Sequence, residues 1–418
     1  MTVTNSRRGA FGGRWRLPTE IGDCHRLYYD VIVCGGGPAG IAAAVGAARL
    51  GASTLLIERY GFLGGMATAG VVHPWMTFHA EDKQLIAGVL QDIIDRLKER
   101  GAYKVSSHFG NVHHCFDPEE LKQVELELVL DAGVRLLLHT LIVDTIREGD
   151  CVRGVATESK SGREEHRGAI IIDATGDGDM AAGGGAEYEK GRAEDGLMQP
   201  MTLQFRMGGV DVRRMPSREE INDIYVAAKE RGEIDNPREN LLWFDTTYED
   251  QIHFNTTRVT HVDGTSGDDL TRAEIESRRQ TWEVVRLLQQ HVPGFERAYL
   301  LWTAPQVGVR ETRRIMGDYV LTEDDVLAAR KFPDAVTLGS YDIDIHNPAG
   351  TGTIIKSLPT GDYYGIPYRC LLPRGLEGLL VAGRPISTTH EAHSSVRIQA
   401  ICSGTGHAAG IAAALAAK

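Results

Sequence analysis

The chain has 418 residues, which is too long for a single ordinary hydrophobic core, so two domains are expected. Its hydrophobic content of 42% and charged content of 24% are typical of a globular enzyme. The net charge of −12 argues against nucleic acid or an anionic membrane as a partner, and no apolar run is long enough to span a membrane.

The cysteines and the N-terminal residues carry little patterning. Six cysteines are scattered along the chain without a C-x-x-C pair, which favours reduced thiols and a cytoplasmic protein over a disulfide framework. Residues 1–27 are expected to form an N-terminal arm over the surface.

The first strongly patterned segment runs from Tyr29 to Glu58. An apolar strand leads into a G-x-G-x-x-G turn and an alanine-rich helix, and a second strand ends at Glu58. In this setting the glycines allow a tight turn, close approach of backbone to a pyrophosphate, and close packing of the helix on the strand, while the acid bonds a ribose hydroxyl. The segment predicts a dinucleotide site made by Gly35, Gly37, Pro38, Ala39, Gly40 and Glu58.

A glycine-rich loop follows the second strand over residues 59–68. Its paired glycines let backbone N–H groups meet a phosphate or a flavin ring. A solvated arginine and a plain structural turn are the alternatives. The residues of this loop expected at the cofactor are Arg59, Gly64, Gly65, Met66 and Thr68.

Helical spacing of apolar residues predicts a helix over 82–100. Asp117, as N-cap before Pro118, predicts the start of another helix. From Val134 the pattern changes to three strands separated by hairpin turns, which is typical of a β-meander.

The last strand of the meander ends in Ala174, Thr175 and Gly176. A strand that returns to the first sheet and ends in this way brings backbone onto the adenosine side of the same dinucleotide. For Asp177, which comes next, a role as a turn residue is the alternative.

Residues 200–364 show no regular alternation of strand and helix. They contain a strand-like run over 201–207, a long helix expected over 272–291 and a second helix expected from Thr322. With residues 72–115 they are expected to form a substrate or cap domain. The dinucleotide-binding domain is then discontinuous and comprises residues 28–71, 116–199 and 365–418.

The C-terminal part is regular again. Strands are expected over 364–372 and 379–382, followed at once by Gly383 and Arg384. A loop is expected from there to Ser395, and a helix from there to the end of the chain.

The N-terminal glycine motif with its acid, the A-T-G after a meander and the C-terminal strand ending in Gly-Arg together resemble the glutathione-reductase-like, two-dinucleotide-motif FAD-binding superfamily. The loop GFLGGMAT gives a closer resemblance to a bacterial FAD-dependent oxidoreductase family within it. The resemblance covers nearly the whole chain from Tyr29 onward, with further similar blocks at 309–326, 341–350, 365–373 and 381–399.

This resemblance implies an α/β fold, a Rossmann-like FAD-binding domain with a β-meander and an inserted α+β cap domain. It implies FAD as the cofactor. Positive partial charge near the flavin pyrimidine stabilises the reduced ring, and an ordinary salt bridge is the alternative for Arg397. The C-terminal residues implied at the flavin are Gly383, Arg384, Ser395 and Arg397.

The function implied is that of an FAD-dependent oxidoreductase that oxidises a small organic substrate by hydride transfer to flavin N5, with a sugar-like alcohol as first choice. An amine oxidase, a C=C reductase and a monooxygenase are alternatives. A non-catalytic electron-transfer or redox-sensing flavoprotein is the alternative of another class. The electron acceptor is open between oxygen, a quinone and a protein, and oligomer formation is left open.

Proton transfer is expected from the C-terminal loop, since histidine is suited to base work near neutral pH. His390 and His393 are the first candidates, and His73 and His346 are held in reserve. The alternative is that these histidines only pack or bond backbone. The family pattern has an aliphatic residue at His393, which points to a different substrate.

A substrate carboxylate would suit the arginine cluster that follows Val309. Surface ion pairs with neighbouring acids are the favoured alternative for the cluster. No metal-ligand spacing is present, so no metal is expected. The candidate substrate contacts are Arg310, Arg314 and Tyr368.

Overall fold

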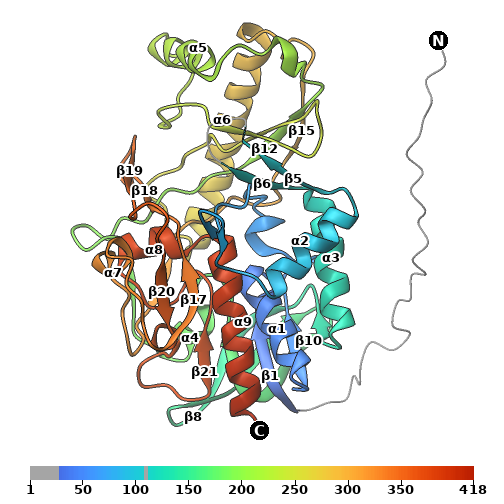
Figure 1. Cartoon of the computed structure of the whole chain (residues 1–418), viewed down its shortest axis with the longest axis vertical. Coiled ribbons are helices and arrows are strands. Elements are labelled where there is room, and N and C mark those ends of the chain that lie inside the picture. Colours follow the sequence, from blue (N-terminus) through green and yellow to red (C-terminus); the bar gives the residue numbers. More distant parts are fainter. Residues whose placement is uncertain (1–27, 108–111) are drawn as a thin grey trace, which may run out of the picture.

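A computed structural model describes residues 28–107 and 112–418 of the chain (Figure 1). The expected N-terminal arm and Cys24 lie outside the described residues. The largest sheet has the order β7-β2-β1-β10-β9-β8, with β21 also paired to β10. Its strands are Tyr28–Cys34 (β1), Thr54–Ile57 (β2), Arg135–Leu137 (β7), Leu141–Glu148 (β8), Cys151–Ser159 (β9), Gly162–Asp173 (β10) and Leu379–Val381 (β21).

β10 belongs to two parts of this sheet. Its second half pairs in parallel with β1 and β21, and β1 and β7 pair in parallel with β2. Its first half forms an antiparallel meander with β9 and β8. Parallel strands are covered on both faces, which accounts for the continuous apolar run of β1. The predicted Rossmann-like α/β fold with a β-meander is confirmed.

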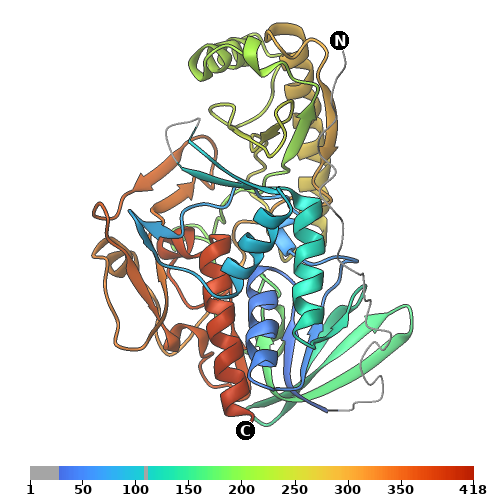
Figure 2. The same ribbon diagram turned by 45° about the vertical axis from the view of Figure 1, so that its right-hand side comes forward.

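Three helices lie against this sheet, and α2 packs on them. Figure 2 shows α9, α1 and α3 side by side, and α2 lies across α3. A Cβ atom on Gly406 of α9 would lie 2.0 Å from the carbonyl oxygen of Ala39, and one on Gly410 would lie 2.1 Å from that of Ala43. Only glycine therefore allows the two backbones to touch. The helices are Pro38–Arg49 (α1), Val89–Glu99 (α2), Pro118–Asp131 (α3) and Gln399–Ala416 (α9).

A second hydrophobic core lies in the upper part of Figure 1. It is built from a four-stranded antiparallel sheet of order β13-β14-β12-β15 and from α5 and α6. Its buried apolar residues run from Phe205 to Ala298. Its elements are Phe205–Gly208 (β12), Arg218–Glu230 (α5), Trp243–Asp245 (β13), Ile252–Phe254 (β14), Gly267–His291 (α6) and Tyr299–Thr303 (β15).

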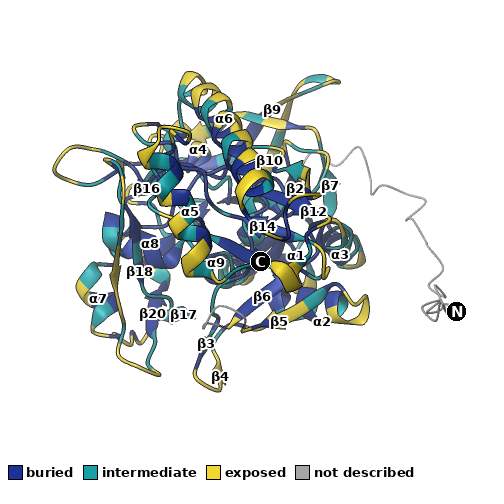
Figure 3. Cartoon of the chain, turned by 90° about the horizontal axis from the view of Figure 1, so that it is seen from above, coloured by how far each residue is buried: buried dark blue, intermediate teal, exposed yellow. Residues whose placement is uncertain are grey.

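The remaining strands form two-stranded pairs, β3-β4, β5-β6, β11-β16, β17-β20 and β18-β19. These strands are His79–Ala80 (β3), Lys83–Gln84 (β4), Tyr103–Ser106 (β5), His113–Phe116 (β6), Tyr188–Lys190 (β11), Arg313–Ile315 (β16), Ala335–Gly339 (β17), Ile343–His346 (β18), Thr353–Lys356 (β19) and Tyr364–Pro367 (β20). The short helices are Asp179–Gly183 (α4), Glu323–Leu327 (α7) and His390–Val396 (α8), with 3-10 turns at Gly65–Ala67, Val212–Arg214 and Tyr368–Leu371. Exposed residues gather on β4 and the outer side of α6, whereas α8 is buried (Figure 3).

The predicted helix over 82–100 begins too early. Its apolar spacing extends back to Leu85, but Gly88 has a φ of 61° and serves as the N-cap of α2. The preceding residues instead form the β3-β4 pair. The helix predicted after Asp117 is confirmed as α3, and the Asp117 side chain accepts hydrogen bonds from two backbone N–H groups of its first turn.

Three other boundaries differ from prediction. The strand expected over 364–372 ends at Pro367 and continues as a 3-10 turn. The expected loop up to Ser395 contains α8, whose N-cap Thr389 accepts from the backbone N–H of Ala392. The last helix therefore begins at Gln399, after a break at Ile398.

The hydrophobic cores divide the chain differently from the predicted domains. α2, expected in the cap, buries its apolar face in the same core as α1 and β1. Residues from Ile315 to Ile345 also contribute to that core. The predicted cap boundaries stay a prediction. Outside the main core, one cluster lies around α5 and α6, and two smaller ones lie around Met201 and Leu203. Within the described residues, 28–107 and 112–418, no helix combines the length and apolarity needed to cross a membrane.

Candidate functional site

A cavity of about 450 Å³ lies where the carboxyl ends of β1, β10 and β21 meet the overlying residues. Ligands in open α/β sheets bind at this edge of the sheet. The predicted cofactor residues in its lining come from segments far apart in the sequence. They are Gly35, Gly37, Pro38, Ala39, Glu58, Arg59, Gly65, Met66, Ala174, Thr175, Gly176, Gly383, Arg384 and Arg397.

The first glycine turn leaves backbone open to a ligand. Gly37 is the N-cap of α1, and a Cβ atom there would find its nearest neighbour 3.7 Å away. Gly40 does not line the cavity. Its Cβ atom would lie only 1.7 Å from the carbonyl oxygen of Gly35, so this glycine lets helix and strand pack. The turn thus has an open face toward the cavity and a tightly packed back, as a dinucleotide cradle requires.

Glu58 lies at the cavity wall at the end of β2. Its carboxylate accepts hydrogen bonds from the backbone N–H groups of Gly36, at 2.7 Å, and Tyr60, at 2.9 Å. Burial raises the pKa of Glu58, while these two bonds oppose that rise. The side chain is therefore fixed beside the cavity, where a ribose hydroxyl could donate to it.

Two loop residues predicted to contact the cofactor, Gly64 and Thr68, instead form hydrogen bonds to nearby backbone. The backbone N–H of Gly64 donates to the carbonyl oxygen of Gly36 at 2.8 Å. The Thr68 hydroxyl donates to the carbonyl oxygen of Leu63 at 2.5 Å. Neither residue lines the cavity. They hold the loop against the first turn, and this places Gly65 and Met66 at the wall.

The far wall joins the meander to the C-terminal motif. Arg384 forms an ion pair with Asp177 at 2.7 Å, and both residues line the cavity. Asp173, at the end of β10, accepts from the Thr175 hydroxyl and the backbone N–H of Ala181, and burial raises its pKa to about 6. These bonds fix the turn that carries the expected adenosine contacts. Asp177 is thus more than a turn residue.

Of the two flavin contacts predicted before the last helix, Ser395 and Arg397, only Arg397 lines the cavity. Ser395 does not line the cavity, because its hydroxyl bonds the carbonyl oxygen of Tyr341 and the hydroxyl of Tyr364. Arg397 does line it. Its guanidinium donates to the carbonyl oxygen of Asp344 at 3.3 Å, and its Nε has no partner in the described part of the chain.

The open glycine turns and the fixed acid fit a dinucleotide such as FAD. The turns at Gly35 and Gly383 both line the cavity, and Arg384 and Arg397 bring positive charge to the side of the C-terminal motif. The residues present therefore suit the cofactor that the sequence implied.

The four candidate histidines fall into two pairs. His73 and His346 line the cavity, whereas His390 and His393 do not. His390 and His393 were expected in a loop, but both lie on α8, where residues three apart share a face. His390 Nδ1 lies 2.9 Å from a carboxylate oxygen of Glu311. His393 is fully buried, and burial lowers its pKa.

The two remaining cavity histidines have different hydrogen bonds. His346 Nδ1 lies 3.2 Å from the Arg258 guanidinium, which can only donate, so Nδ1 accepts and Nε2 carries the proton. His73 Nε2 lies 3.0 Å from the carbonyl oxygen of Asp245, which can only accept, so this nitrogen carries the proton. Its Nδ1 has no partner among the described residues.

Of the three candidate substrate contacts, only Arg310 lines the cavity. Arg310 lines the cavity and donates to the carbonyl oxygen of Pro200 and the hydroxyl of Thr202. Arg314 is buried elsewhere in an ion pair with Glu311 at 2.5 Å. Tyr368 lies outside the lining at the start of a 3-10 turn. The ion-pair alternative therefore describes Arg314, although the pair is buried.

The sequence reasoning missed three groups at the inner end of the cavity, which are Arg238, Tyr341 and Asp344. The Tyr341 hydroxyl donates to the Asp344 carboxylate at 2.8 Å. The alternation D-I-D-I-H could have revealed Asp344, because it places that residue and His346 on one face of β18. Arg238 lies in a loop between elements, and no local pattern marks it.

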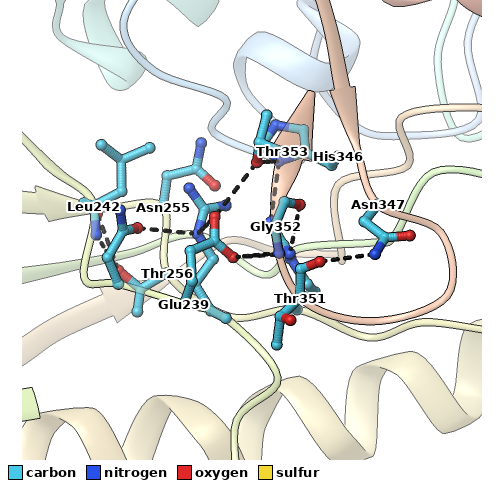
Figure 4. A network of polar contacts seen from close by, with 12 residues as sticks. Glu239, Leu242, Asn255, Thr256, His346, Asn347, Thr351, Gly352 and Thr353 are labelled. Atoms are coloured by element: carbon cyan, nitrogen blue, oxygen red, sulfur yellow. Dashed lines mark hydrogen bonds and ion pairs between the residues drawn. The ribbon is translucent and has the colours of Figure 1, made fainter. Parts of the chain in front are cut away.

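A polar network holds the β18-β19 pair against the loop that carries Arg238. Figure 4 shows Glu239 directed toward Gly352 and Thr353. The Glu239 carboxylate accepts from the backbone N–H of Gly352 at 3.1 Å and pairs with Arg258 at 3.0 Å. We call the part of the cavity lined by Arg238, Tyr341 and Asp344 the inner chamber. These bonds fix its two sides relative to each other. Over residues 28–107 and 112–418, no group of three or more His, Cys, Asp or Glu is arranged to hold a metal ion.

Comparison with known proteins gives a family match and several distant similarities. The model of the FAD dependent oxidoreductase family matches residues 30–418. Over 74 residues the chain is 39% identical to a Dictyostelium discoideum protein provisionally named a bifunctional amine oxidase, a match that spans 18% of this chain and 7% of that protein.

Two solved structures illustrate the structural similarities. A geranylgeranyl bacteriochlorophyll reductase-like protein from Thermoplasma acidophilum has 15% identity and a TM-score of 0.46, with 93% of this chain and 77% of that one covered. A triple mutant of the flavin-dependent brominase Bmp2 has 14% identity and a TM-score of 0.49, with 93% and 80% covered. The family match extends over the cofactor turns, the meander, the overlying block and the last helix. The chain therefore belongs to the FAD-dependent oxidoreductase family, and its cofactor is FAD.

Proposed function

We propose that this enzyme oxidises a small organic substrate in the inner chamber of the cavity, with a sugar-like alcohol as the first choice. The observation that carries the proposal is a single cavity whose lining includes both the cofactor turns and a group of ionisable side chains from the overlying residues. When bound, FAD supplies the two-electron redox chemistry, with N5 of the flavin as hydride acceptor. The protein supplies binding, orientation and proton transfer.

The chain offers distinct groups for these tasks. His73, with a free Nδ1, is the proposed proton acceptor, and the Nε2–H group of His346 is the proposed hydrogen-bond donor to substrate. Apolar walls restrict water in the chamber, with Trp75, Leu242 and Phe244 in the lining. His390 remains a second proposed base, because it bonds Glu311, but it would have to act from outside the lining.

The finer assignments are proposals as well. Cofactor motifs near both ends of the chain support membership of the glutathione-reductase-like superfamily. Every described cysteine is unpaired, which supports a cytoplasmic location. The electron acceptor is proposed to be oxygen, a quinone or a protein.

Anaerobic mixing with candidate substrates tests the function. The protein should purify yellow with FAD, and an alcohol substrate should bleach the flavin absorption. Bleaching only by amines would identify an amine oxidase, and oxidation by an activated alkene after chemical reduction would identify a C=C reductase. Formation of a hydroxylated product with oxygen and a reduced nicotinamide would identify a monooxygenase. Failure of every class to react would favour an electron-transfer or redox-sensing flavoprotein.

Replacement of Glu58 by Ala is expected to weaken FAD binding. The ribose would lose a charged hydrogen-bond acceptor worth about 1.5–3 kcal/mol, which corresponds to about a 10–150-fold rise in Kd. Titration of apoprotein with FAD, followed by quenching of flavin fluorescence, measures this change. Glu58→Gln keeps one acceptor oxygen for the turn and should fall between the parent and Ala. An unchanged Kd in both variants would contradict the ribose contact.

A further inference from the structure

The inner chamber carries more positive than negative charge. Three guanidinium groups line it, those of Arg238, Arg310 and Arg397, and that of Arg258 lies against the lining residues His346 and Glu239. Two carboxylates face them, and each is already held. Glu239 pairs with Arg258 at 3.0 Å, and Asp344 lies 3.7 Å from Arg397.

Arg310 is the least neutralised of these cations. It is nine-tenths buried, and its donors reach a backbone carbonyl, the Thr202 hydroxyl and, at 3.4 Å, the side-chain oxygen of Asn255. No carboxylate of the described chain pairs with it. A buried charge without a counter-charge is strongly unfavourable, so a site of this kind is complementary to a negative ligand.

Arg238 is a second buried cation whose charge is incompletely balanced. It is 4% exposed, lines the cavity, and has an Nη1 without a hydrogen-bond partner in the described residues. Its contact with Glu239 is long, at 3.9 Å. Burial, with repulsion from Arg397, Arg238 and Arg258, lowers the pKa of Arg310.

The opposite end of the cavity has no such excess. There Arg384 is paired with Asp177, and Arg59 lies beside Glu58. The surplus positive charge is therefore placed at the inner chamber, on the side of β18 and the 238–242 loop, and not beside the first glycine turn.

We propose that the substrate is an organic acid whose carboxylate binds Arg310 and Arg238 while its oxidised carbon lies toward the flavin. The proposal rests on the proposed function and narrows its substrate class to hydroxy acids, including sugar acids. Arginine binds a carboxylate through two parallel hydrogen bonds, which fixes orientation as well as position. A neutral alcohol would leave Arg310 without a counter-charge and Arg238 with only its long contact to Glu239.

Matched pairs of compounds test the proposal on the oxidised holoenzyme. Gluconate is compared with sorbitol, and lactate with propane-1,2-diol, since each pair differs by a carboxylate. Binding is read from the perturbed visible absorption of the flavin and from calorimetry, so no turnover is needed. Each acid should bind at least about tenfold more tightly than its alcohol partner, as expected for loss of a charged hydrogen bond. Equal binding within both pairs, or no binding by either acid, would overturn the proposal.

Three variants locate the effect. Arg310→Met should remove the preference for the acid, and Arg310→Lys should retain part of it. Arg213→Met is the control, because Arg213 is 90% exposed and lies outside the cavity. FAD content is measured for each variant. An acid preference that survives in FAD-loaded Arg310→Met would also overturn the proposal.

The outcomes separate this inference from the proposed function. An enzyme that holds FAD and is bleached by a neutral alcohol, with no preference for acids, retains its function and loses the organic-acid proposal. An enzyme that no class of substrate reduces loses the proposed function, even if acids perturb its flavin spectrum.

Discussion

Replacement of His73 by Asn is expected to slow flavin reduction by substrate about 10²–10⁴-fold, the usual contribution of a general base. His73 lines the cavity, donates from Nε2 to the carbonyl oxygen of Asp245 and keeps Nδ1 free of partners within the described residues. Burial, with repulsion from Arg206 and His113, lowers its pKa from 6.5 to about 3. The imidazole is therefore neutral throughout the neutral range and keeps the lone pair on Nδ1 that a base requires, although a pKa this low makes it a weak base.

Stopped-flow reduction of FAD-loaded enzyme measures this effect. His393→Leu is the matched control, since His393 is equally buried but does not line the cavity, and it should change the rate by less than about threefold, too little for a lost base. Slow reduction in His390→Ala or His393→Ala, with a normal rate in His73→Asn, would contradict the assignment to His73 and show that the base lies on α8.

The pH profile gives an independent check on His73. Its base form persists down to about pH 3, so this histidine should impose no loss of rate between pH 8 and pH 5. An acidic limb near pH 6.5 that disappears in His73→Asn would show a higher pKa in the working enzyme and contradict this description of the site.

Acidification is expected to destabilise the fold steeply. Burial lowers the pKa of His73 to about 3 and that of His114 to about 4, and it also lowers the pKa values of His253, His346 and His393. Between these values and 6.5 each histidine is neutral when folded and protonated when unfolded. The unfolded state then binds more protons, so the free energy of unfolding falls as the pH falls.

The size of the effect follows from linkage. Each such proton contributes about 1.4 kcal/mol per pH unit below the unfolded pKa, so two histidines contribute about 2.7 kcal/mol per unit. Asp173 opposes them, because its pKa is raised to about 6 and its folded state takes up a proton as the pH falls from 6 toward 3.8. The five histidines outnumber the four carboxyl groups whose pKa is raised among the described residues, which are Glu58, Glu125, Asp173 and Asp179.

Denaturant unfolding of the holoprotein at a series of pH values from 8 to 5 measures this loss. His393→Leu should reduce the slope below pH 6.5 by about 1.4 kcal/mol per pH unit and leave the slope above pH 7.5 unchanged, which serves as the internal control. A stability that stays flat between pH 7 and pH 5 would show that these imidazoles are solvated and charge freely.

The cofactor half of the site was predictable because its signals are local. The glycine spacing after β1 and the acid at the end of β2 each follow from a turn, a helix start or a strand end within a short segment. The same holds for the cap of α3 at Asp117, which is confirmed in detail. Glu58, the acid predicted to bond the ribose, is held by its own turn through the backbone N–H groups of Gly36 and Tyr60.

The inner chamber was not predictable because tertiary contacts assemble it. Arg238 and Arg310 come from separate loops, and only the packing of β18 against the 238–242 loop brings them together. His390 and His393 looked suited to catalysis because they follow Gly383 and Arg384 closely. The N-cap at Thr389 instead starts a buried helix that turns both away from the cavity lining.

The seam of small residues between α1 and α9 has a consequence for how the enzyme is made. On the ribosome α1 (Pro38–Arg49) emerges long before its partner helix α9 (Gln399–Ala416), because most of the described sequence lies between them. Until then the faces around Ala39 and Ala43 have no Gly406 and Gly410 to cover them. Both walls of the site therefore exist only once α9 has been made, and loss of α9 would deprive α1 of its partner as well as remove one wall of the site.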